Sequence, residues 1–187
     1  MRDMKVLPLF ILVFVALLIS SSHISSASDV EPDAASLQGL SEIFVVVEDL
    51  PTQVAKSGVS EDQLKAVVEE KLRGAGIKAL SMAEYLRTPN LPYFSVYISA
   101  FGGKSGLINT TFIVELNQGL YLERNPKMHL VLSTWSTGFV GSGGSVRRED
   151  VFVIIEDLVD KFVGAYLLAN NIERYENRKS PRSGFSL

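Results

Sequence analysis

His129, the adjacent Arg147 and Arg148, and several acidic pairs are the side chains of this chain that could do chemistry. A histidine beside a carboxylate can act as a general base. Alternation along the flanking strands, however, predicts His129 beside Leu122 and on the opposite sheet face from Glu115. The chain has no cysteine, so a zinc site would be nearly all carboxylate, which suits zinc poorly. We therefore predict no catalytic residue, no metal site and no cofactor.

Residues 138–144 are glycine-rich and precede a predicted helix, a context in which main-chain amides attract anions. Their spacing matches neither the dinucleotide-binding pattern nor the phosphate loop of nucleotide hydrolases. The preferred interpretation is a flexible link that lets the helix return over a sheet. With Arg147 and Arg148 beside it, the same loop is the place where a small hydrolase or lyase would have its site.

The acidic residues mostly stand as neighbours on predicted caps and helices. Neighbouring helical residues point about 100° apart, so such pairs do not converge on one reacting bond. Solvated helix surfaces explain them better. The pairs are Glu48-Asp49, Glu69-Glu70, Glu149-Asp150 and Glu156-Asp157.

A row of polar and aromatic side chains is predicted on one face of a sheet, and we call it the polar row. Its members are Tyr93, Tyr97, Thr111, Ile113 and Glu115. Tyrosine combines a large contact area with a hydrogen-bonding tip, which suits a binding surface. The competing interpretation is a solvated sheet face that carries these types for their strand propensity.

The elements that must position these residues follow from local patterns. Ser60 and Gln63 form a capping box that starts a helix over 61–73, and a wide apolar stripe predicts a second helix over 146–170. Short apolar runs predict strands at 43–47 and 77–80. Three long alternating segments, at 93–101, 107–123 and 128–137, predict an antiparallel meander.

Hairpin registers with Phe101 opposite Leu107 and Leu116 opposite Trp135 place the bulky apolar side chains on one face, and a bulge at Gly119 would shift the distal half by one residue. We predict an α+β two-layer sandwich, β-α-β-β-β-β-α, with an antiparallel sheet covered on one face by two helices. The predicted core comprises Val45, Val47, Leu64, Val68, Leu72, Phe94, Val96, Phe112, Val114, Trp135, Ile155, Leu158 and Phe162.

The N-terminus has the pattern of a secretory signal peptide: Arg2 and Lys5, then 14 apolar residues from Val6, then small residues up to Ala27. As a helix this run would span roughly 21 Å, short of the ~30 Å bilayer core, so an uncleaved membrane tether is the weaker interpretation. We expect cleavage near Ala27 and a periplasmic or secreted protein without a stable membrane anchor. A flexible segment over 28–36, one domain over 37–172 and a disordered tail over 173–187 would follow.

The formal net charge of −3, without a basic stripe, argues against nucleic acid as a partner. The absence of cysteine excludes disulfides and a cysteine nucleophile. These exclusions favour an exported binding or assembly module over an enzyme. The module would act through the open sheet face or a strand edge, with a protein partner or a second copy of itself.

Four segments carry a resemblance that spans Leu40 to Asn170. The chain resembles a family of small exported bacterial proteins of unassigned function. The resemblance implies a bacterial, extracytoplasmic setting and assigns no activity, cofactor or site residue. The segments are Glu48–Leu50, Lys71–Ile77, Thr88–Tyr93 and Ser133–Gly138.

Overall fold

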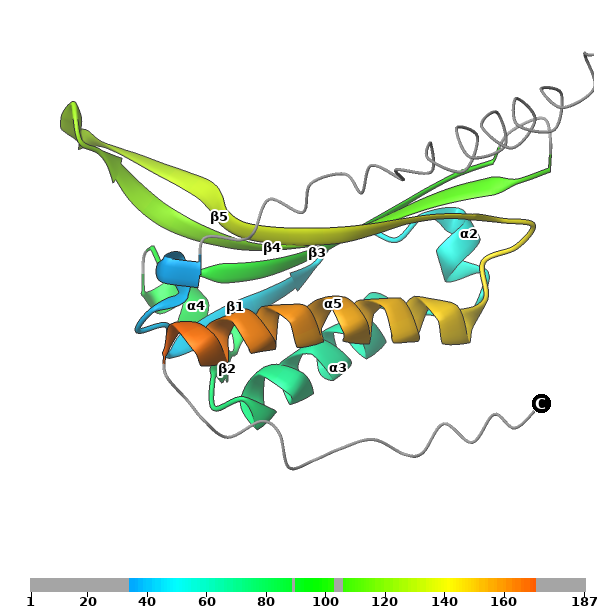
Figure 1. Ribbon diagram of the computed structural model, residues 1–187, viewed down its shortest axis with the longest axis horizontal. Helices are drawn as coiled ribbons and strands as arrows, with labels where there is room; N and C mark the ends of the chain where they lie inside the picture. Colours follow the sequence, from blue (N-terminus) through cyan, green and yellow to red (C-terminus); the bar gives the residue numbers. More distant parts are fainter. Residues whose placement is uncertain (1–33, 89, 103–105, 171–187) are drawn as a thin grey trace, which may run out of the picture. The chain divides into compact units, whose positions relative to one another are not determined.

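A computed structural model describes residues 34–88, 90–102 and 106–170 of the chain and shows an α+β fold built on one open, five-stranded sheet (Figure 1). The predicted signal peptide and C-terminal tail lie outside the described residues. In chain order the elements are η1 (Ala34–Leu37), β1 (Glu42–Val47), α2 (Thr52–Ala55), α3 (Glu61–Gly74), β2 (Lys78–Leu80), α4 (Met82–Arg87), β3 (Tyr93–Gly102), β4 (Ile108–Leu122), β5 (Asn125–Gly143) and α5 (Arg148–Ala169).

The sheet has the order β2-β1-β3-β4-β5 and is mixed rather than antiparallel throughout. β1 runs parallel to both β2 and β3, whereas β3, β4 and β5 form the predicted antiparallel meander. Parallel neighbours need a crossover connection, and α3 supplies one between β1 and β2. The predicted class and order of main elements are thus confirmed, with a correction to the direction of β1.

The two long helices, α3 and α5, pack on one face of the sheet, as Figure 1 shows. We call this the helix face and its opposite the outer face. The Ser60 hydroxyl accepts a hydrogen bond from the main-chain N–H of Gln63, and the Gln63 side-chain oxygen accepts one from the main-chain N–H of Ser60, which completes the predicted capping box. Every predicted core residue is buried except Val47, which packs against the core from a half-buried position.

The β3–β4 register differs from the prediction by two residues. Val96 lies opposite Val114 and Ile98 opposite Phe112, whereas Val96 was expected opposite Phe112. A shift of two returns every side chain to the same face. The prediction of which residues face the helices therefore survives the error in register.

The β4–β5 register is confirmed at its inner end, where Leu116 lies opposite Trp135. Beyond this pair Asn117 lies opposite Ser133, so β5 inserts Thr134 as the extra residue of a bulge. The predicted register without a shift, with Leu120 opposite Val131, is therefore wrong in the distal half; the alternative, a bulge at Gly119, had the right one-residue shift but lies two residues too far along β4. Because of the shift, His129 lies opposite Tyr121 rather than beside Leu122.

The glycine-rich residues 138–143 form the last part of β5, so the predicted flexible link is wrong there. Gly138 lies opposite Ile113, and a Cβ atom at Gly138 would approach the carbonyl oxygen of Phe112 to 2.7 Å. A glycine inside a strand often marks such a close approach of main chain. Here the glycine allows pairing to continue rather than ending it.

The turn η1 is fastened to both the sheet and α5. Ser36 donates its hydroxyl hydrogen to the carbonyl oxygen of Thr134 at 3.2 Å, and the amide of Gln118 donates to the carbonyl of Ser36 at 3.0 Å. Asn170, at the end of α5, donates to the carbonyl of Leu37, which is fully buried. Ser36, which was predicted to lie in a flexible segment, thus makes hydrogen bonds to the sheet.

Candidate binding surfaces

The five predicted residues of the polar row lie together on the outer face, on adjacent strands. Tyr97 lies opposite Ile113, and Glu115 lies opposite Ser95. Tyr97 is 40% exposed, whereas Tyr93, Thr111, Ile113 and Glu115 are half-buried. The row exists as a surface, and its use in binding stays a prediction.

One end of the outer face is closed by its own polar contacts. Ser95 and Asn117 are buried, and the Asn117 amide donates to the Ser95 hydroxyl at 3.1 Å. Burial, followed by the charges of neighbouring groups, raises the pKa of the Tyr93 phenol. These groups satisfy each other within the fold, which leaves Tyr97 as the main exposed aromatic of the row.

Arg147 and Arg148 lie at the start of α5, on the helix face, and do not join the polar row. Arg147 forms two hydrogen bonds to the Asp150 carboxylate, at 2.7 and 2.6 Å. This contact raises the pKa of Arg147 and lowers that of Asp150. Arg148 donates to the carbonyl of Gly58 and to Gln63 of the α3 capping box. Both arginines thus hold parts of the chain in place.

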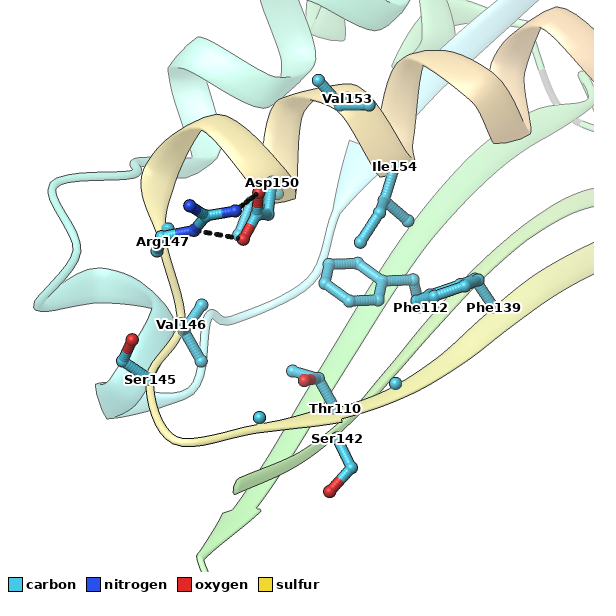
Figure 2. Close-up of a pocket in the computed structure, with 13 residues that line it drawn as sticks. Thr110, Phe112, Phe139, Ser142, Ser145, Val146, Arg147, Asp150, Val153 and Ile154 are labelled. Carbon is cyan, nitrogen blue, oxygen red and sulfur yellow. Dashed lines mark hydrogen bonds and ion pairs between the residues drawn. The ribbon is translucent and has the colours of Figure 1, made fainter. Parts of the chain in front are cut away.

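A cavity of about 320 Å³ lies between the inner ends of β4 and β5 and the start of α5 (Figure 2). Its wall is largely apolar, with Phe112, Phe139 and Ile154 on one side and the Arg147–Asp150 pair on the other. The volume is at the lower end of the range for small-molecule sites. A small apolar group with one charged end would fit its chemistry.

The hydroxyls that line this cavity do not join the charged pair. Ser142 points away from Asp150 in Figure 2, and within the described part of the chain Asp150 bonds only Arg147. A hydrolytic site needs a nucleophile and a base in hydrogen-bond reach. The cavity therefore has the shape of a ligand site without an assembled nucleophile–base pair.

His129 is packed rather than poised for catalysis. Its ring lies 5.1 Å from that of Tyr121, and its Nε2 atom is buried beside Gly119 without a hydrogen-bond partner among the described residues. The bulge turns His129 to the same face as Glu115, contrary to expectation. Tyr121, opposite His129, nevertheless lies six positions along β4 from Glu115, about 20 Å. His129 therefore forms no pair with Glu115, nor with another carboxylate of the described residues. In the described ranges, no three His, Asp or Glu side chains gather to hold a metal ion.

The sequence did not single out residues 118–133, the outer ends of β4 and β5 with their turn, which we call the β4–β5 arm. β3 pairs with β4 only up to Asn117, so the arm has two strands, and Figure 1 shows it extending past η1 and the end of α5. Apolar side chains are exposed on both of its faces. Leu120 (41%), Met128 (47%) and Leu132 (47%) lie on the helix face, and Tyr121 (64%) and Val131 (51%) lie on the outer face.

The two edges of the sheet differ in how they are protected. The β2 edge is three residues long and carries Lys78, which pairs with Glu42 and Glu84. Short length and charge are common protections against edge-to-edge pairing. The β5 edge has 19 residues, of which Lys127 alone is charged. Only the β5 edge therefore offers a long, apolar row of free main-chain groups.

Two protections divide the β5 edge. Pro126 and Lys127 stand near its start, and the bulge at Thr134, covered by Ser36, interrupts its middle. Between them the six residues Met128–Ser133 contain no proline, glycine, aspartate, glutamate, lysine or arginine. Such a segment has the composition that favours strand pairing between chains. The run of uncharged, mostly apolar residues in the third segment of the predicted meander, 128–137, was the sequence signal that could have identified this edge.

Comparison with known proteins finds no matching family model and no matching curated protein. Among solved structures, a PelC variant dodecamer from Paraburkholderia phytofirmans is similar at 13% identity, covering 65% of this chain and 87% of that chain, with a TM-score of 0.39. A minor lipoprotein from Acinetobacter baumannii is similar at 12% identity, covering 71% and 94%, with a TM-score of 0.30. Scores this low establish no shared fold.

Proposed function

We propose that this chain is an exported, non-enzymatic assembly module that contacts a protein partner through the β4–β5 arm. The observation that carries the proposal is the unprotected edge Met128–Ser133 on an arm with exposed apolar side chains on both faces. Exposed apolar surface of this kind marks interaction sites in proteins. The N-terminal sequence pattern supports export. Within the described ranges no helix is long and apolar enough to cross a membrane.

The arm supports this function better than the polar row does. The row offers one exposed tyrosine and polar groups that already bond each other, such as Ser95 and Asn117. The arm offers five exposed apolar side chains and free main-chain donors and acceptors. Strand addition to an edge uses main-chain hydrogen bonds for affinity and alternate side chains for specificity. β5 offers both the free main-chain groups and the exposed alternate side chains.

The test is native mass spectrometry of the full chain recovered from an exporting bacterial host. Leu132 is half exposed, so Leu132→Asp leaves the core intact while it puts a charge on the arm. We expect the wild type in a complex and Leu132→Asp as a free monomer. The control Val153→Asp changes an equally apolar residue, 66% exposed on α5, and should keep the complex. Identical spectra for all three proteins would contradict the proposal.

A second candidate function rests on the cavity at the start of α5. A small hydrolase or lyase there would bind an apolar group against Phe139 and an anionic group beside Arg147. The pairing of Arg147 with Asp150 counts against it, because the arginine charge is already neutralised. A bound small molecule in the same mass spectrum, lost in Phe139→Ala, would favour this candidate over the assembly module.

A further inference from the structure

The geometry points to a second copy of this chain as the occupant of the arm: we infer that residues Met128–Leu132 of two copies pair as antiparallel strands about a two-fold axis at Leu130. This inference rests on the proposed function and names its partner. Its first support is the arm itself. An isolated two-stranded ribbon is at best marginally stable in water. Pairing of two arms makes a four-stranded sheet, in which both outer strands are the β4 segments.

Symmetry restricts how two β5 edges can meet. Residues directly opposite each other in an antiparallel pair point to the same face. A two-fold axis perpendicular to the sheet therefore passes through a residue and not between two residues. With the axis at Leu130, Met128 lies opposite Leu132 of the second copy, and Val131 lies opposite His129. The apolar row of the helix face then continues across the junction.

An axis moved by one residue would place part of the paired stretch at the bulge, where Ser36 already covers the edge. An axis at Val131 would extend the paired stretch symmetrically to Thr134, whose carbonyl oxygen already accepts the Ser36 hydroxyl. The axis at Leu130 ends the pairing at Lys127 and Ser133 instead. It also sets each Lys127 opposite a serine, so the two ammonium groups do not face each other. The free stretch of edge therefore favours the axis at Leu130 over the axis at Val131.

The paired surface is small. Met128, Val131 and Leu132 lie on the paired β5 strands, whereas Leu120 and Tyr121 lie on the outer β4 strands, away from the junction. The area buried by the pairing therefore falls below the roughly 1,200–2,000 Å² of standard specific interfaces. We therefore expect a dimer in equilibrium with the monomer over accessible protein concentrations.

The absence of cysteine makes the register directly testable by cross-linking of the full, purified chain. Residues on the axis of an antiparallel pair have Cα atoms about 4.5–5.5 Å apart, within the usual range for a disulfide. Leu130→Cys should give a disulfide-linked dimer under mild oxidation, and Val131→Cys should give at least tenfold less. Val153→Cys, on α5, is the control for random collision.

A dimer linked through Val131→Cys and not through Leu130→Cys would overturn the register. A Leu130→Cys protein that cross-links no faster than the Val153→Cys control would overturn the two-copy pairing. Because Leu130 is half-buried, light scattering of Leu132→Asp gives an independent reading. We expect at least a tenfold weaker dimer than the wild type, and an unchanged mass distribution would also overturn the inference.

The outcomes also separate this inference from the proposed function. Suppose the purified wild type is monomeric, yet Leu132→Asp removes a different protein from the complex recovered from the host. The arm would then be an assembly surface for another partner, and only the two-copy pairing would fail. If Leu132→Asp changes neither the recovered complex nor the purified protein, both fail together.

Discussion

The hydroxyl of Ser36 donates to the main-chain carbonyl of Thr134, the residue that β5 inserts at its bulge, at 3.2 Å. Gln118 completes the contact from β4, donating to the Ser36 carbonyl at 3.0 Å and to the Thr134 hydroxyl at 2.8 Å. One short turn thereby covers the middle of the longest edge in the sheet. The stretch Met128–Ser133, on the arm side of this cover, stays open for pairing with another chain.

Gln118→Ala removes both amide contacts and should loosen η1 from β5. A net hydrogen bond contributes about 1 kcal/mol, so loss of both should make the amide hydrogens of η1 and its turn exchange roughly thirtyfold faster. Hydrogen exchange followed by NMR at Leu40, whose N–H donates to Leu37, measures this. The same amide in Gln53→Ala, a change outside this contact, should exchange at the wild-type rate.

Gly138→Ala should destabilise the fold by about 1–3 kcal/mol, because the new Cβ atom would lie 2.7 Å from the Phe112 carbonyl oxygen. Main chain cannot move aside as a side-chain tip can. Urea unfolding measures the loss. Gly144→Ala is the matched control, since nothing lies within 4 Å of its Cβ position, and it should change stability by less than about 0.5 kcal/mol. Equal effects would refute the close-approach explanation.

The Glu84 carboxyl should titrate well below other glutamates. The main-chain N–H of Ser81, followed by the Lys78 ammonium, lowers the pKa of Glu84 to about 2. A carboxyl with a lowered pKa contributes stability above its ordinary value of 4.5, and that contribution is lost as the pH falls toward 2. In Lys78→Ala we expect the pKa of Glu84 to rise part of the way, because Ser81 still donates.

NMR titration of the Glu84 side chain checks this shift. Lys161→Ala removes an ammonium that pairs with Asp157 on α5 and should leave Glu84 unchanged. A Glu84 pKa at its ordinary value in the wild type would show that the capping contact does not hold the carboxylate in solution.

Tyr97→Ser tests the polar row against the arm. Tyr97 is the main exposed aromatic of the polar row, 40% exposed and opposite Ile113. If the arm carries assembly, this change should leave the mass of the recovered complex unchanged, whereas Leu132→Asp should reduce it. Loss of the complex in Tyr97→Ser, with the fold intact by circular dichroism, would move the site to the outer face.

Local chemistry made part of this fold predictable from sequence. The capping box at Ser60 and the alternation around Phe94 and Val114 depend on neighbours in the chain, so they identified α3 and the buried face. Alternation cannot distinguish registers that differ by two residues, which is why Val96 was paired with Phe112. Pattern fixes the face of a residue but not its partner.

The missed features depend on contacts between distant segments. Gly138 was interpreted as a link because glycine is common in loops, yet its role is set by the Phe112 carbonyl on the next strand. The bulge at Thr134 has no local signal, since the residue that covers it is Ser36, 98 positions earlier. The arm was missed for the same reason: its exposure follows from β3 pairing with β4 only up to Asn117.

The unequal edges of this sheet also set how far an assembly can grow. Two-fold pairing at Leu130 would cover the Met128–Leu132 stretch of the β5 edge in each copy. The outer strands of the joined arms would be the short β4 segments, and the far edge of each sheet would be β2, which is three residues long and carries Lys78 in ion pairs. Because a two-fold interface uses the same stretch in both copies, this pairing closes at two subunits, so a chain with an aggregation-prone segment would form a closed dimer instead of a fibre.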